Sequence, residues 1–323
     1  MQTFKNPVSP FDAPDPCMLY DDVTGYYYAL FTRGSKLELF RSRHAGNIVT
    51  DADSRIIYEK NPERDGTYGC IWAPEMHRGS DGRWYIYTSA SIRADHSQKR
   101  LFIMQGPSDD PFSGEWRFMG YPTPDIFSID PTIYTAPDGK QYICCSRLDD
   151  VVGQVLDICD MENPYTFGKN RATIAKAELD WELVIPYVKN YAIVEGPFFV
   201  EKNGRLFIIY SANGCWSDHY ALGVLEHTGG ELCDAKNWKK HDKPIFTYGN
   251  GVFGPGHATF FYSPDKTEIW CAYHGMKETN PDSKPAKRYF NLQKIDFDDS
   301  GYPISAIPVG YEVELPAPSG EAE

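Results

Sequence analysis

One short unit recurs five times along the chain and constrains the fold more than any other feature. Each copy has a polar residue near a proline, a short strand, a turn rich in Asp, Asn or Gly, and a second strand rich in aromatic residues. The polar residues stand at intervals of 55 to 65 residues: Asp15, Glu75, Asp130, Glu195 and His257. Self-similarity at a fixed period is typical of repeat architectures. Because radially repeated sheets form a β-propeller, we predict an all-β, five-bladed propeller that forms a single domain over residues 1–323.

The fourth copy shows the unit most clearly. Residues 191–214 read YAIVEGPFFVEKNGRLFIIYSANG, with Glu195 between an apolar approach and Gly196-Pro197. The two strands flank the dipeptide Asn203-Gly204, which is a strong signal for a β-hairpin with a two-residue turn. A carboxyl in apolar surroundings either forms an ion pair or keeps its proton at neutral pH. A Glu in a strand-entry turn is the structural alternative, and the fivefold recurrence favours a functional role.

The repeated acidic residues point to the chemistry. Equivalent positions on the innermost strands of a propeller converge on its axis, so the five polar residues are expected around one funnel. Two carboxyls suffice to hydrolyse a glycosidic bond, one as acid and one as base or nucleophile. Glu195 has the more apolar setting, which suits a proton donor, whereas Asp15 has polar neighbours that suit an ionised base. A charge on Asp130 would raise the pKa of Glu195, and Asp130 would also orient it.

Four further residues are candidates for substrate binding. Trp72 is either core or a stacking platform for a sugar, and Glu75 follows it in the motif WAPEMH. His257 is either a structural residue or part of the site, because Gly254 and Gly256 let the backbone approach closely there. Arg288 enters the closing strands and points either to the funnel or to solvent. We predict that Trp72, Glu75, His257 and Arg288 contact substrate.

Composition narrows the ligand. The formal net charge is −13 and the sequence has no run of Lys or Arg, which argues against nucleic acid and anionic membranes. An acidic polysaccharide would also be repelled. The chain has 22 Tyr, 18 Phe and 7 Trp, more than the strands require, and exposed aromatic rings stack on sugars. A neutral, plant-derived oligosaccharide or polysaccharide is therefore the expected partner.

The cysteines and the N-terminus bear on location and local structure. The eight cysteines include no C-x-x-C pair, and several stand within predicted strands, which favours free thiols and a reducing compartment. Residues 1–16 show no signal-peptide pattern. We therefore expect a cytoplasmic location; a secreted or periplasmic one would require a leader removed before residue 1.

Only residues 171–179 (RATIAKAEL) have some helical character, and we interpret them as an inserted turn.

The motifs together resemble glycoside hydrolase family 43 over nearly the whole chain. They are PDP at 14–16, WAPE at 72–75, SIDP at 128–131, EGP at 195–197 and GPGH at 254–257. The resemblance implies an inverting glycosidase with Asp15 as base, Asp130 as pKa modulator and Glu195 as acid. It also implies that His257 lies near a Ca²⁺ or Na⁺ ion or water in the central channel, and that Arg288 is the late active-site arginine. The chemistry requires no cofactor, and any such ion is expected to be structural and held through water.

Within that family, the motifs look most like the α-L-arabinofuranosidase branches. The expected substrates are arabinan, arabinoxylan or oligosaccharides derived from them. β-Xylosidase and endo-arabinanase activity remain alternatives, although many xylosidases of the family carry a C-terminal β-sandwich and this chain ends with the propeller. The alternative from another class is a non-catalytic, sugar-binding propeller, which has no need of three carboxyls in register on separate blades.

Overall fold

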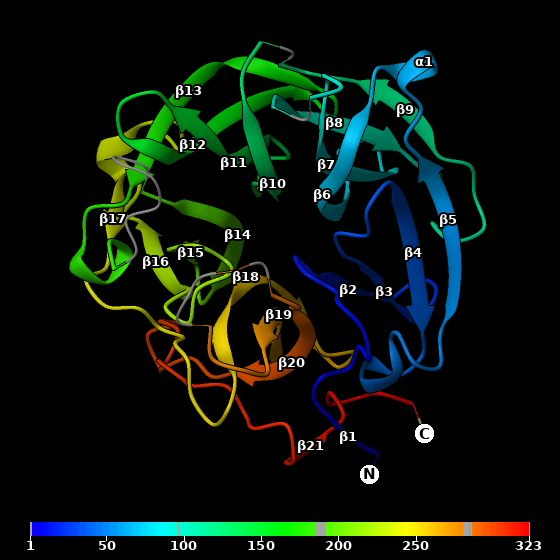
Figure 1. Ribbon diagram of the computed structural model, residues 1–323, viewed down its shortest axis with the longest axis vertical. Coiled ribbons are helices and arrows are strands. Elements are labelled where there is room, and N and C mark those ends of the chain that lie inside the picture. Colours follow the sequence, from blue (N-terminus) through cyan, green and yellow to red (C-terminus); the bar gives the residue numbers. More distant parts are fainter. Residues whose placement is uncertain are drawn as a thin grey trace.

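A computed structural model of the protein describes residues 2–95, 97–123, 125–184, 192–280, 284 and 286–322. Its strands form five antiparallel sheets arranged radially around a central axis, which confirms the predicted five-bladed β-propeller (Figure 1). Each blade starts at the axis with its innermost strand, and successive strands lie farther out. Among the described residues, the helices are too short or too polar to cross a membrane.

The blades follow one another in chain order. Blade 1 contains β2 (Cys17–Asp21), β3 (Tyr26–Leu30), β4 (Lys36–Ser42) and β5 (Asp53–Glu59). Blade 2 contains β6 (Tyr68–Arg78), β7 (Trp84–Ser91), β8 (Lys99–Gln105) and β9 (Arg117–Gly120). Blade 3 contains β10 (Ser128–Thr135), β11 (Gln141–Asp149), β12 (Gly153–Asn163) and β13 (Thr166–Lys176). Blade 4 contains β14 (Val194–Lys202), β15 (Arg205–Ala212), β16 (Ala221–His227) and β17 (Trp238–Lys240). Blade 5 contains β18 (Phe253–Tyr262), β19 (Ile269–Met276) and β20 (Tyr289–Ile295).

The hairpin of the fourth repeat forms as predicted. Lys202 pairs with Arg205, so Asn203 and Gly204 alone make the turn between β14 and β15. Both turn residues have positive φ, 52° for Asn203 and 74° for Gly204. This is the backbone of a type I′ turn, whose twist matches that of the flanking strands.

The hydrophobic core is divided among the five junctions between blades. Each buried cluster contains side chains from two neighbouring blades, including the junction between blades 5 and 1. Tyr28 of β3 packs against Trp84 of β7 at one junction, and Phe246 packs against Tyr273 of β19 at another. Because each sheet buries both faces against neighbours, aromatic side chains fill the widening wedge between blades. The aromatic content of the sequence is therefore used largely in these wedges.

The N-terminal segment closes the ring onto blade 5. β1 (Thr3–Lys5) pairs with β21 (Glu314–Pro316), and the Asn6 side chain bonds both the N–H and the carbonyl of Leu292. The Val8 N–H donates to the Phe290 carbonyl at 2.9 Å. Among the described residues blade 5 has three strands, and residues 6–13 lie along the free edge of β20. The N-terminal residues are therefore a closing element.

The prediction for residues 171–179 was wrong in part. Residues 171–176 belong to β13, the outermost strand of blade 3, and Arg171 pairs with Cys159 of β12. Intrinsic helix propensity is a weak preference, and pairing with β12 overrides it here. The chain beyond them forms a short 3₁₀ turn (Asp180–Glu182), and residues 185–191 lie outside the described residues.

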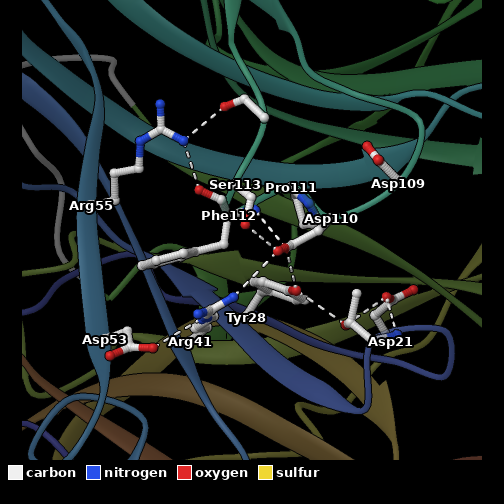
Figure 2. A network of polar contacts seen from close by, with 12 residues as sticks. Asp21, Tyr28, Arg41, Asp53, Arg55, Asp109, Asp110, Pro111, Phe112 and Ser113 are labelled. Carbon is white, nitrogen blue, oxygen red and sulfur yellow. Dashed lines mark hydrogen bonds and ion pairs between the residues drawn. The ribbon is translucent and has the colours of Figure 1, made fainter.

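A polar network at the perimeter joins blades 1 and 2 (Figure 2). The Asp110 carboxylate, in the loop between β8 and β9, accepts hydrogen bonds from Tyr28 Oη at 2.9 Å and the Arg41 guanidinium at 3.3 Å. It also accepts the Phe112 N–H at 2.9 Å, which fixes the loop itself. Arg55 donates to the carbonyls of Phe112 and Gly114 at 2.7 and 2.8 Å. The β8–β9 loop of blade 2 is thereby attached to strands β3, β4 and β5 of blade 1.

Candidate active site

The same backbone irregularity occurs in or just before every innermost strand. One residue there has a left-handed backbone: Asp15 (φ 56°), Ala73 (46°), Asp130 (55°), Gly196 (54°) and His257 (47°). In blades 2 to 5 the strand register shifts at this point, as in a β-bulge. A left-handed non-glycine residue costs about 1–3 kcal/mol, and such strain is found mainly at functional sites.

The bulges define which positions are equivalent. Ala73 occupies the position of Asp15 in blade 2, so Glu75 lies two residues farther along β6 than the repeat alignment assumed. In blade 4 the equivalent residue is Gly196, and Glu195 precedes it. The intervals in the sequence are too variable to fix this register, because the loops between blades differ in length.

A pocket of about 450 Å³ opens where the bulges meet. It is lined by acidic, basic and aromatic side chains from all five blades: Asp15, Thr32, Trp72, Phe127, Ile129, Asp130, Gln154, Ile193, Glu195, Cys215, Trp216, His257 and Arg288. The volume lies within the range of about 300–1,000 Å³ typical of small-molecule sites. Six of the seven residues singled out from the sequence are among these, and Glu75 is not.

Asp15 is held by three side chains. Thr32 Oγ1 donates to its Oδ2 at 2.6 Å, and the Arg288 guanidinium donates to its Oδ1 at 3.0 Å. Its backbone N–H donates to Nδ1 of His274 at 3.1 Å. Burial alone would raise the pKa of Asp15, but the Arg288 cation and the rings of His257 and His274 hold that pKa well below its usual range. Asp15 is therefore a carboxylate at neutral pH.

Glu195 has the opposite electrostatic setting. The Tyr220 hydroxyl donates to its Oε1 at 2.9 Å, which leaves Oε2 to carry a proton. Gly256 is what lets Tyr220 come close, because a Cβ at this position would lie 2.4 Å from the Tyr220 ring. Burial, reinforced by the charge of Asp15 and opposed by the Tyr220 hydrogen bond, raises the pKa of Glu195 to about 7. Glu195 is therefore suited to donate a proton near neutral pH.

Asp130 is linked to Glu195 through the backbone. Its Oδ2 accepts the N–H of Gly196 at 3.1 Å. Burial, followed by the negative charges of Glu195 and Asp15, raises the pKa of Asp130 well above its usual range. A side chain at Gly196 would be strained, since its φ is 54° and a Cβ would lie 3.1 Å from Nδ1 of His257. The three carboxyls thus lie in one buried site, where the charge of Asp15 opposes ionisation of the other two.

His257 lies between two of the carboxyls. Its backbone N–H donates to Ser211 Oγ at 2.8 Å, and its Nδ1 lies 3.5 Å from Oδ1 of Asp15 and 3.8 Å from Oδ2 of Asp130. Burial lowers its pKa, although the charge of Asp15 opposes that shift. A neutral ring therefore separates the two carboxyls, and the ring stacks on His274 with 6.0 Å between centroids.

Glu75 lies behind the pocket wall. Its carboxylate is buried and lies 2.8 Å from Nε2 of His77, a ring that stacks on Phe198. Burial raises the pKa of Glu75, and its charge contributes to the raised pKa of Asp130. This differs from its expected place among the substrate-contacting residues, and the physical reason is the two-residue offset at the bulge of β6.

Several site residues have no signal in the sequence. Thr32, Tyr220 and His274 come from the second and third strands or the loop before them, where the repeat shows nothing distinctive. Phe127, Cys215 and Trp216 line the pocket from loops, and Gln154 lines it from the start of β12. The glycines around His257 were the one usable hint, because they indicate a close approach, and the approaching group is Tyr220.

The donor groups around His257 do not fit a cation coordinated directly by side chains. Among the described residues, no group of three or more His, Cys, Asp or Glu is arranged to hold a metal. His274 accepts the Asp15 N–H at Nδ1, so its buried Nε2 carries the hydrogen and is no ligand. Burial keeps His274 neutral by lowering its pKa to about 3.

Comparison with known proteins finds relatives that are similar to this chain in sequence. The family described as glycosyl hydrolases family 43 matches residues 4–303. The chain is 32% identical over 284 residues to an extracellular exo-α-(1→5)-L-arabinofuranosidase of Streptomyces chartreusis, covering 85% of this chain and 83% of that protein. It is also 32% identical over 299 residues to α-L-arabinofuranosidase 43 of Humicola insolens, covering 88% of this chain but only 60% of that protein.

A solved structure agrees with the sequence comparisons. The crystal structure of an α-L-arabinofuranosidase from Lactobacillus brevis superposes with a TM-score of 0.85 at 30% identity. The match covers 96% of this chain and 98% of that one, so the similarity extends over the whole propeller.

Proposed function

The chain belongs to glycosyl hydrolase family 43, and we propose that it is an inverting α-L-arabinofuranosidase. In this proposal it releases L-arabinofuranose from the non-reducing ends of arabinan, arabinoxylan or oligosaccharides derived from them. The proposal rests on the division of charge within the pocket. Arg288 keeps Asp15 ionised, while burial keeps a proton on Glu195 near neutral pH.

That division supplies both proton transfers of glycoside hydrolysis. Asp15 removes a proton from a water molecule as the water attacks the anomeric carbon. Glu195 gives its proton to the departing glycosidic oxygen, so the leaving sugar departs as a neutral alcohol. The two carboxyls then hold the charges opposite to those at the start, and proton exchange with solvent restores them.

Neighbouring residues support these roles. Thr32 and Arg288 each hold one oxygen of Asp15, which fixes the direction of the base. Asp130 accepts the N–H of Gly196 and so restrains the backbone beside Glu195. A charge on Asp130 also opposes ionisation of Glu195, so Glu195 stays protonated up to a higher pH.

The proposed substrate rests on the pocket walls and on the relatives. Trp72, Phe127 and Trp216 line the pocket and offer apolar faces to a neutral sugar ring. The similar proteins at about 30% identity are named as arabinofuranosidases. A β-xylosidase or an endo-arabinanase would share the same carboxyls. Experiment therefore decides which sugar is released and whether cleavage occurs at chain ends or within the chain.

A panel of substrates tests the proposal. The purified protein is assayed on nitrophenyl α-L-arabinofuranoside, nitrophenyl β-D-xyloside and linear arabino-oligosaccharides, and the products are separated by chromatography. Asp15→Asn is the matched control for contaminating activity. Arabinose as the only early product supports exo-acting arabinofuranosidase activity. Xylose release at a higher kcat/KM than arabinose release would indicate a β-xylosidase. Oligosaccharides as early products would indicate an endo-arabinanase. Saturable sugar binding with no product from any substrate would indicate a sugar-binding propeller.

A further inference from the structure

A buried lysine lies directly beneath the most exposed aromatic ring of the pocket. Lys99, the first residue of β8, is only 3% exposed, and its Nζ lies 3.7 Å from the ring centroid of Trp72. The same ammonium donates to the Cys70 carbonyl at 2.7 Å. Trp72 is 38% exposed and lines the catalytic pocket. One face of the indole is therefore occupied by a cation.

The ammonium has no acidic partner. Within residues 2–95, 97–123 and the other described ranges, no carboxylate lies within ion-pair distance of Lys99 Nζ. Burial of an ammonium without a counter-ion is costly, and the carbonyl and the π face offset only part of that cost. A group that lowers stability is retained mainly where function requires it. Its position against a pocket residue indicates what that function is.

The rest of Trp72 is held by other contacts. Its carbonyl accepts the Thr88 Oγ1 hydrogen bond at 2.7 Å, and its register partner is Ser89 on β7. These contacts fix the backbone of Trp72. Among the described residues, the Lys99 ammonium is the cation that lies over the indole face, and Lys99 itself does not line the pocket.

We propose that Lys99 positions Trp72 as the aromatic wall on which a sugar of the substrate stacks. This inference rests on the proposed glycosidase function for its substrate, although the contact itself does not. Lys99 acts through Trp72 and touches no reacting atom, so its effect falls on substrate binding. The ligand it selects is a neutral sugar ring with an apolar face.

The proposal has a pH signature. Burial lowers the pKa of Lys99 to about 8, with a small opposing contribution from the Cys70 thiol on β6 and a reinforcing one from Lys60, which follows β5. Because the neutral amine has no cation–π attraction, Trp72 loses its restraint as pH rises through that value. KM should therefore increase on the alkaline side, while kcat follows the catalytic carboxyls.

Kinetics of Lys99→Met test the proposal. Methionine keeps the volume and removes the charge, so KM at pH 7 should rise about three- to tenfold with kcat within about twofold, as expected for a lost cation–π contact. The alkaline rise in KM should disappear, and Lys99→Arg should restore most of the affinity. Lys202→Met is the matched control, because Lys202 lies 5.9 Å from the Phe297 ring at the far end of β14. An unchanged KM, or an equal loss in kcat, would overturn the proposal.

A second measurement separates the contact from the glycosidase function. The protein is labelled with 5-fluorotryptophan, and the ¹⁹F signal of Trp72 is assigned from Trp72→Phe. That signal should titrate near pH 8 in the wild type and stay flat in Lys99→Met. A titrating signal in a protein that hydrolyses no glycoside would support the contact and reject the proposed function. A flat wild-type signal in an active enzyme would reject the proposal and leave the function standing.

Discussion

The N–H of Gly196 donates to Oδ2 of Asp130 at 3.1 Å, so the carboxyl of blade 3 is joined to the residue directly after the carboxyl of blade 4. This bond positions Glu195 through its own backbone. It also brings two acidic groups into one buried site. Burial raises the pKa of both, the charge of Glu195 adds to the shift of Asp130, and the charge of Asp15 adds to the shift of Glu195. Asp130 therefore has a positional and an electrostatic effect, which substitution can separate.

Asp130→Asn should move the alkaline limb of the kcat/KM profile to lower pH. Asparagine keeps the shape and removes the charge that opposes ionisation of Glu195, so the Glu195 pKa falls and its proton is lost earlier. The acidic limb, which reports Asp15, should move less. If the rate falls and the alkaline limb stays in place, Asp130 acts by position alone. Movement of that limb to higher pH would contradict the electrostatic argument.

Arg288→Gln should move the acidic limb to higher pH. The guanidinium lowers the pKa of Asp15 against the effect of burial, so its loss lets Asp15 take up a proton at a higher pH. Arg288→Lys is the control, since it keeps a positive charge and should shift the limb less. The pH dependence of kcat/KM gives the result, and an unmoved acidic limb in Arg288→Gln would show that Arg288 does not set the Asp15 pKa.

Glu195→Gln and Asp15→Asn should respond differently to the leaving group. Without a proton donor, alkyl arabinosides should lose about 10²–10⁴-fold in kcat/KM, whereas activated aryl arabinosides need less protonation and are partly spared. Asp15→Asn removes activation of water and should reduce kcat/KM equally on both substrates. Rates on matched alkyl and aryl substrates test this. Equal losses for Glu195→Gln on the two substrates would argue against Glu195 as the acid.

Asp110→Asn should destabilise the propeller without altering the site. The amide cannot accept all the bonds that Tyr28, Arg41 and Phe112 give the carboxylate, so the free energy of unfolding should fall by about 1–2 kcal/mol. Asp109→Asn is the matched control, because the Asp109 side chain lies outside the network (Figure 2). Urea unfolding of both variants gives the comparison, and equal stability of the two would show that the network contributes little.

The architecture could be predicted because its signals are local and repeated. A turn rich in Asp, Asn or Gly and the aromatic strands recur in every unit, so five blades follow from pattern alone. The pocket position of Asp15, Asp130 and Glu195 also follows, since each stands where an inner strand starts. These inferences require only the period and the strand direction.

The remaining features depend on three-dimensional register. The bulge in β6 places Ala73 at the position equivalent to Asp15, and Glu75 does not line the pocket. No residue type in the sequence predicts that shift. His274 reaches the carboxyls from a strand that looks like an ordinary buried strand, and Tyr220 reaches them from the residue just before β16. Residues 171–176 have helical propensity, but the free edge of β12 makes them a strand. Long-range pairing decided each of these cases.

The stereochemistry of the first product tests the central claim most directly. If Asp15 activates water and Glu195 protonates the leaving oxygen, an α-L-arabinofuranoside is attacked once, from the opposite face. Proton NMR recorded during the first minutes of hydrolysis should then show β-L-arabinofuranose before mutarotation. The α anomer as first product, or a trapped glycosyl-enzyme, would contradict the account.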